Sequence, residues 1–163
     1  MRTNRVVYAN RTKLKSRSRK RKTSRATKVG ENQIATLAIF VIPKFLEMVN
    51  TIKLYHWKTS SYATHKATDQ LFADLNLKTD EFVEVLLGKS EINRDKTLQF
   101  TNVKIKSFST NTECKKQIEE YKAFLIKLPS HKSFNSAMNV DLLAIRDEIV
   151  ALLNQFLYLL TLK

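Results

Sequence analysis

The chain has few of the residues that interrupt or cross-link regular structure. Its 163 residues include two glycines, two prolines and one cysteine. Sheets joined by tight turns need more glycine and proline, so a mostly helical chain is predicted. The single cysteine, Cys114, excludes an internal disulfide and is typical of a reducing compartment. We interpret Cys114 as a small apolar core residue rather than a redox thiol, because no cysteine motif surrounds it.

Acidic residues are absent from the first thirty positions, which hold twelve Lys and Arg residues. The other 17 basic residues are set against all 15 acidic ones, so the rest of the chain contributes only +2 to the net charge of +14. We therefore predict a basic arm, residues 1–30, and a nearly neutral helical body, residues 31–163. A block of like charge cannot bury itself, and the arm is predicted to be disordered when it is alone.

Long apolar runs are also missing. The run 34–43 has about ten residues, too few to span a bilayer, and the run 149–162 contains Asn154 and Gln155. We expect no membrane span. The sequence also has no Ser/His/Asp triad, glycine-rich phosphate loop or paired-cysteine site, so it gives no support to a hydrolase, a kinase or a zinc ribbon.

Four segments carry apolar residues at steps of three and four, the spacing of an amphipathic helix. They span about 32–57, 61–88, 111–128 and 140–161. Pro43 predicts a kink or a local break in the first segment, whereas Gly88 and Pro129 mark the ends of the second and third. Alternating apolar residues near 98–105 hint at a short strand, but we interpret residues 89–110 mainly as a long crossover.

The connection lengths predict how these helices are arranged. A short turn makes the first two antiparallel neighbours, and about twenty residues then allow a crossing along the whole bundle. The predicted fold class is all-α, a ferritin-like four-helix bundle with a long crossover between the second and third helices.

Residues 56–84 hold side chains that suit a transition metal. On the predicted second helix, His65 is followed by Asp69 four residues later, and Asp80 by Glu84. Asp69 and Asp80 are three turns apart with about 20° left over, so these four side chains share one face. Imidazole and carboxylate together suit iron or zinc. The candidate ligands are His56, His65, Asp69, Asp80 and Glu84.

The two pairs on this helix are separated by about 16 Å along its axis, at about 1.5 Å per residue. One helix therefore cannot bring both pairs to one ion, whereas two antiparallel copies could, in an isologous dimer with two equivalent sites. Taken singly, each residue also has an ordinary interpretation: a helix end for His56, a surface side chain for His65, and a solvated face for the carboxylates.

The stretch 54–88 resembles the Dps family, the DNA-binding ferritin-like proteins of starved cells. The likeness rests on His56-Trp57, then His-x-x-x-Asp at 65–69, then Asp-x-x-x-Glu at 80–84. The resemblance implies an intersubunit ferroxidase site with iron. It implies that His56, His65 and Asp69 come from one chain, that Asp80 and Glu84 come from its partner, and that Trp57 lies beside the iron. The chain is also similar to an uncharacterised family encoded by large DNA viruses of algae and protists.

The basic arm predicts a polyanionic partner, either nucleic acid or an acidic protein surface. Several Dps proteins carry a lysine-rich N-terminal tail that binds DNA, and residues 1–30 resemble an enlarged version. No zinc finger or helix-turn-helix is present, so sequence-independent binding to phosphates is expected. The candidate nucleic-acid-binding residues are Arg11, Lys13, Lys15, Arg17, Arg19, Lys20, Arg21, Lys22 and Arg25.

Two functions follow from these patterns. The preferred one is a structural virion protein, minor capsid or core-associated, whose arm binds nucleic acid or neighbouring virion proteins. The alternative is a Dps-like ferroxidase that binds and protects DNA, with iron at a site between chains of a dimer or larger homo-oligomer. The expected location is a virion or an infected cell, and otherwise the cytoplasm or nucleus.

Overall fold

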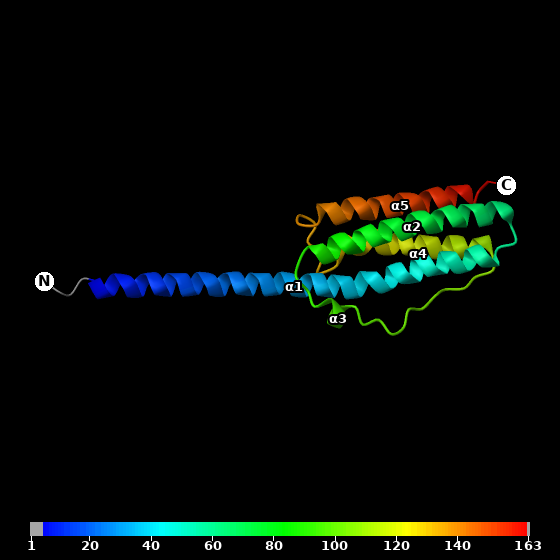
Figure 1. Ribbon diagram of the computed structural model, residues 1–163. Helices are drawn as coiled ribbons and strands as arrows, with labels where there is room; N and C mark the ends of the chain where they lie inside the picture. Colours follow the sequence, from blue (N-terminus) through cyan, green and yellow to red (C-terminus); the bar gives the residue numbers. More distant parts are fainter. Residues whose placement is uncertain (1–4, 163) are drawn as a thin grey trace.

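The computed structural model describes residues 5–162, with side chains from residue 30 onward, and every regular element in this part is helical (Figure 1). The prediction of an all-helical chain is confirmed. The hint of a strand near 98–105 was wrong, because these residues have no neighbouring strand to pair their backbone groups. The elements are α1 (Arg5–Lys58), α2 (Tyr62–Gly88), α3 (Arg94–Thr97), α4 (Asn111–Lys127), the 3-10 turn η1 (Leu128–Ser130) and α5 (Val140–Leu159).

The four long helices lie side by side, and their directions follow from the connections between them (Figure 1). A three-residue turn makes α2 antiparallel to α1. The connection that contains α3 then runs the length of the bundle, so that α4 points the same way as α2 and α5 returns antiparallel to both. Helix α2 packs on α1 and α5, and α4 packs on α5.

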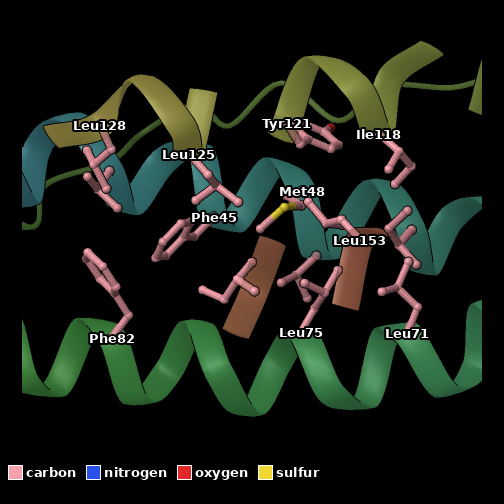
Figure 2. Close-up of a cluster of buried hydrophobic side chains, with 14 of the residues drawn as sticks. Phe45, Met48, Leu71, Leu75, Phe82, Ile118, Tyr121, Leu125, Leu128 and Leu153 are labelled. Atoms are coloured by element: carbon pink, nitrogen blue, oxygen red, sulfur yellow. The ribbon is translucent and has the colours of Figure 1, made fainter. Parts of the chain in front are cut away.

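The core is formed by the apolar stripes of all four helices, as Figure 2 shows. Phe45 and Met48 of α1 lie opposite Leu75 and Phe82 of α2, and the Phe45 and Phe82 rings meet edge to face at 5.1 Å. Cys114 is fully buried at the start of α4, which confirms its assignment to the core. Each buried leucine, isoleucine, phenylalanine or methionine of these stripes contributes about 1.5–3 kcal/mol by leaving water, so the stripes hold the helices together.

The long crossover is attached to the side of α1. The backbone N–H of Lys106 donates to the hydroxyl of Thr51 over 3.0 Å, and Thr51 is fully buried. Two residues further on, the ring of Phe108 packs on that of Tyr55, with centroids 4.8 Å apart. These contacts lead the chain to the N-terminus of α4.

Helix α1 differs from its prediction in two ways. It continues through Pro43 without the local break that was one of the two expectations there, because the removal of one backbone donor is tolerated where core packing holds both halves. It also begins at Arg5 rather than near residue 32, and its first part projects beyond the bundle (Figure 1). The arm was predicted to be disordered alone. The packed part of α1 supplies the helical nucleus, so residues before it need only extend an existing helix, and Lys and Arg do so readily.

By length and composition alone, the segment Gly30–Lys58 could cross a membrane. Half of its most apolar stretch is buried inside the bundle.

Candidate functional site

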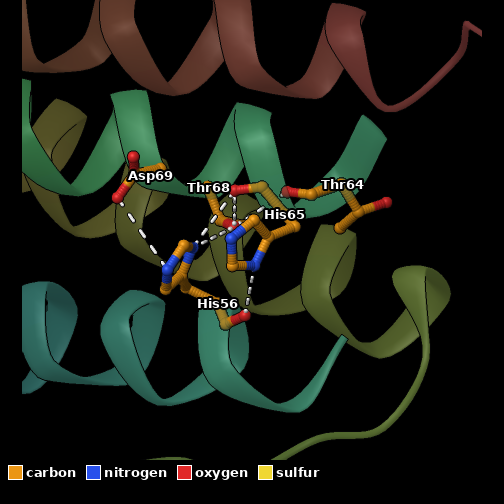
Figure 3. Close-up of polar contacts among 5 residues, drawn as sticks. All are labelled: His56, Thr64, His65, Thr68 and Asp69. Atoms are coloured by element: carbon orange, nitrogen blue, oxygen red, sulfur yellow. Dashed lines mark hydrogen bonds and ion pairs between the residues drawn. The ribbon is translucent and has the colours of Figure 1, made fainter. Parts of the chain in front are cut away.

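The hairpin between α1 and α2 brings two histidines into contact. His56 lies in the last turn of α1 and His65 in the first turn of α2. The turn between them is short because Ser61 caps α2, its hydroxyl accepting the N–H of Thr64 at 3.3 Å. The two imidazole rings stack with their centroids 4.0 Å apart and their planes 25° apart (Figure 3).

Reciprocal hydrogen bonds fix the orientation of both rings. His56 Nδ1 lies 3.1 Å from the His65 carbonyl oxygen, and His65 Nδ1 lies 3.2 Å from the His56 carbonyl oxygen. A carbonyl oxygen only accepts, so each Nδ1 carries the proton and donates it. In the neutral rings each Nε2 is then left with its lone pair, which is the tautomer in which histidine binds a metal through Nε2.

Asp69 is the third member of this group. Its Oδ1 lies 3.8 Å from His56 Nε2, and its side chain is about half exposed, whereas His56 is buried (Figure 3). The unprotonated nitrogen of His56 and the carboxylate of Asp69 therefore face the same space. His56 thus contacts both His65 and Asp69, and the expectation that the three serve as ligands stays a prediction.

Sequence reasoning missed the supporting role of Thr68. Its hydroxyl donates to the Thr64 carbonyl at 2.8 Å and lies 3.3 Å from His56 Nδ1, so it can also accept a bond from His56. Thr64 and Thr68 are both buried on the side of α2 that faces the hairpin. The available signal was a pair of threonines, one turn apart, at core-facing positions.

Asp80 and Glu84 lie further along α2 and do not reach the histidines. Both are exposed, and among the described side chains neither forms an ion pair or a hydrogen bond. Asp80 borders a groove of about 410 Å³ between α1 and α2, whose walls include Leu46, Phe72 and Val83. The chain thus presents a face with nitrogen and oxygen ligands at one end, an apolar groove in the middle, and two carboxylates at the other end. We call it the α1–α2 face.

One chain alone does not complete a metal site in the part that the structure describes. No group of three or more His, Cys, Asp or Glu side chains is placed there to hold an ion. The three residues at the hairpin and the two carboxylates at the far end remain separate sets.

Lys53 is a second residue that sequence reasoning missed. Its Nζ lies 4.3 Å from the Phe72 ring centroid and 5.7 Å from that of Trp57. Trp57 is 69% exposed at the end of α1. The ammonium group thus rests on two aromatic faces and adds a positive charge to the α1–α2 face. The signal was a lysine one helical turn before the His-Trp pair.

The nine candidate nucleic-acid-binding residues, Arg11 to Arg25, belong to the projecting part of α1. Their side chains lie outside those that the structure describes.

Comparison with known proteins gives one positive result. The model of DUF5856, a family of unknown function, matches residues 56–160, which is more than half of the chain. The chain belongs to the DUF5856 family. The matched segment begins at His56 and contains all five candidate metal ligands, but DUF5856 does not cover the basic arm or most of α1. No curated protein and no solved structure matches the chain.

Proposed function

We propose that this protein is a ferritin-like, Dps-like iron(II) oxidase that works as a dimer or larger assembly and binds nucleic acid through residues 1–30. One observation carries the proposal. His56 contacts both His65 and Asp69 at one end of the α1–α2 face, and Asp80 and Glu84 have no partner among the described side chains at the other. Sequence patterns alone favoured a structural virion protein, but this arrangement supports the alternative.

The ferritin-like assignment is supported by the helix directions. In ferritin-like bundles, two antiparallel pairs are joined by a connection that runs the length of the bundle, so that the second and third long helices are parallel. The connection 89–110 has this course, and α2 and α4 point the same way (Figure 1).

Antiparallel pairing of two α1–α2 faces would complete two equivalent sites. The second copy has the same separation of about 16 Å between its two pairs, in the opposite direction. Its carboxylate pair would therefore lie opposite the histidine end of the first copy. His56, His65 and Asp69 of one copy would then meet Asp80 and Glu84 of the other. The apolar groove beside Phe72 would be covered in the same step, which removes apolar surface from water and favours pairing.

The donor set suits iron as a substrate. Two imidazole nitrogens hold Fe(II), and three carboxylates favour the more highly charged Fe(III) that forms when an electron passes to peroxide or oxygen. His56 and His65 would bind through the Nε2 atoms that their Nδ1 hydrogen bonds leave unprotonated. Neither ring would need to turn to bind.

The test is Fe(II) oxidation followed optically with purified protein. We expect turnover that the single variants His65→Ala and Glu84→Ala each reduce by about a hundredfold, consistent with loss of a metal ligand. Asp74→Ala is the matched control, because Asp74 lies on α2 but, among the described side chains, bonds only to Gln70, and this variant should oxidise iron normally.

Mixing the two inactive variants tests whether the site is shared. Random pairing makes half of the dimers mixed, and each mixed dimer has one intact site, so co-refolding should restore about a quarter of the wild-type sites. Turnover without recovery on mixing would contradict the intersubunit site. Turnover by the wild-type protein no faster than by the doubly substituted chain would contradict the oxidase.

A structural role in a virion is the second candidate, and the projecting basic helix favours it (Figure 1). The twelve cations of the first thirty residues could fix the bundle to packaged nucleic acid without any chemistry at the α1–α2 face. If the protein oxidises iron normally, the arm would serve to attach the oxidase to nucleic acid. Absence of oxidation together with tight nucleic-acid binding would favour the structural role.

A further inference from the structure

A pocket of about 560 Å³ lies at the end of the bundle where the projecting part of α1 begins, opposite the hairpin. Three segments line it: the start of the packed part of α1, the residues that directly follow α2, and the loop before α5. Its walls include Ile34, Lys89, Ser90, Glu91, Met138 and Asn139. None of these residues belongs to the α1–α2 face or to the proposed iron site.

Two polar groups in this pocket lack a partner in the described part of the chain. The hydroxyl of Ser90 is buried and forms no hydrogen bond. Asn139 is 5% exposed; its amide nitrogen donates to the Asn135 carbonyl at 2.9 Å, but its side-chain oxygen accepts nothing. An asparagine before a helix usually accepts a backbone N–H, yet Asn139 makes no such bond to α5. A buried polar atom without a partner is costly, so the Ser90 hydroxyl favours a polar ligand, to which the Asn139 oxygen offers a further acceptor.

The charges around the pocket indicate the sign of that ligand. Among the lining residues whose side chains the structure describes, Lys89 is the only cation, and it is already bound: its Nζ lies 2.7 and 2.8 Å from the carboxylate oxygens of Asp141 and donates to the Met138 carbonyl at 3.3 Å. Glu91 is exposed at the rim and forms no ion pair with the described side chains. The unpaired groups are therefore acceptors and a carboxylate, which suit a positively charged hydrogen-bond donor.

We propose that this pocket binds a small protonated alkylamine, such as a diamine. The carbon chain lies against Ile34 and Met138, whose side chain is 75% exposed, and the ammonium group donates to Glu91, Ser90 and Asn139. An ammonium group has three donors and no acceptor, so it satisfies these groups without leaving a new unpaired atom. This site is independent of the proposed iron oxidation.

The test is isothermal titration calorimetry of the full chain, freed of nucleic acid at high salt. The probe is diaminobutane, and butanediol is its neutral counterpart of similar shape. We expect saturable binding of one diamine per chain, with the diol about tenfold weaker or worse. Glu91→Gln and Ser90→Ala should each weaken diamine binding about tenfold. Glu120→Gln, an exposed substitution on α4 away from the pocket, should bind as the wild type does.

Equal binding of the diol and the diamine would overturn the proposal, as would an affinity of Glu91→Gln equal to that of Glu120→Gln. Glu91 is exposed, so its substitution is not expected to disturb folding, and circular dichroism checks each variant. Iron oxidation measured on the same preparations separates this site from the hairpin, because Glu91→Gln should leave that rate unchanged.

Discussion

Cys114 illustrates how a residue's surroundings decide its chemistry. Burial raises the pKa of its thiol from 9.0 to about 12, so the reactive thiolate is scarce at neutral pH. Tyr121, buried on the same helix beside Glu47, has a pKa raised in the same direction, chiefly by burial. Both groups fit the folded state only in their neutral forms.

We predict that the folded state loses stability as the pH rises above about 9. The unfolded chain releases the Cys114 proton near its ordinary pKa of 9.0, whereas the folded chain keeps it until about pH 12. Below pH 9 both states hold this proton and the folded state has its full stability. Between pH 9 and 12 only the unfolded state releases the proton, which favours unfolding, so the free energy of unfolding falls as the pH rises toward 12. Urea unfolding at about pH 8 and pH 10.5 measures the loss, and Cys114→Ala should lose less than the wild type. An equal loss in both proteins would contradict the assignment.

Among the elements, α4 has the most complete start. The Thr110 hydroxyl accepts the Glu113 N–H at 3.2 Å, and the Glu113 carboxylate accepts the N–H groups of Ser109 and Thr110 at 2.9 and 3.1 Å. These bonds lower the pKa of Glu113. They also fix where the long crossover ends and the third long helix begins.

We predict that Thr110→Ala destabilises the protein by about 1 kcal/mol, the usual effect of losing an N-cap. Thr110→Ser keeps the hydroxyl and is the matched control. The free energy of urea unfolding for the two variants measures the difference. Equal free energies would show that the Thr110 hydroxyl contributes little beyond the bonds that the Glu113 carboxylate accepts.

Gly30 lies inside α1, where the projecting part meets the bundle. An added Cβ would meet nothing within 4 Å, and a helix-interior glycine costs about 1 kcal/mol relative to alanine. We predict that Gly30→Ala slows amide hydrogen exchange around residue 30 about fivefold. Gly88→Ala, at the last residue of α2, is the control and should leave that region unchanged. Unaltered exchange in Gly30→Ala would contradict a local weakness there.

The sequence predicted the long helices well because their apolar residues repeat over many turns. The ends of α2 and α4 were also predictable from Gly88 and Pro129, since both residues disfavour helix continuation. The length of α1 was not, because charge composition indicates whether a segment can bury itself, not whether an adjacent helix will extend through it. Similarly, the spacing of His65 and Asp69 indicated a shared face, but the stacked rings depend on the exact hairpin turn.

At the scale of the whole molecule, charge and core are separated along one helix. The first thirty residues hold twelve cations, whereas the packed part of α1 supplies core residues such as Leu37 and Ile52. Nucleic acid held by the arm would therefore need no basic surface on the bundle.

We predict that nucleic-acid binding is sequence-independent and strongly dependent on salt. Each phosphate that the arm neutralises releases counterions, so the logarithm of affinity should fall linearly with the logarithm of salt, with a slope of about −0.9 per phosphate on duplex DNA. Fluorescence anisotropy across salt concentrations measures this slope. Alanine at the five cations Arg17, Arg19, Lys20, Arg21 and Lys22 together should reduce the size of the slope by several units. The control Lys115→Ala on α4 should leave the slope unchanged. A slope unaffected by the arm variant would contradict the assignment.

The unbroken course of α1 has a geometric consequence for any paired form. Two chains joined antiparallel through their α1–α2 faces would send their arms out at opposite ends, because each arm continues its own α1 beyond the bundle (Figure 1). At about 1.5 Å per residue, each arm would extend about 37 Å beyond the bundle. Such a pair could not clamp one duplex with both arms at the same point. It would instead link two duplexes, and the length of the paired bundle plus its two arms would set the distance between them.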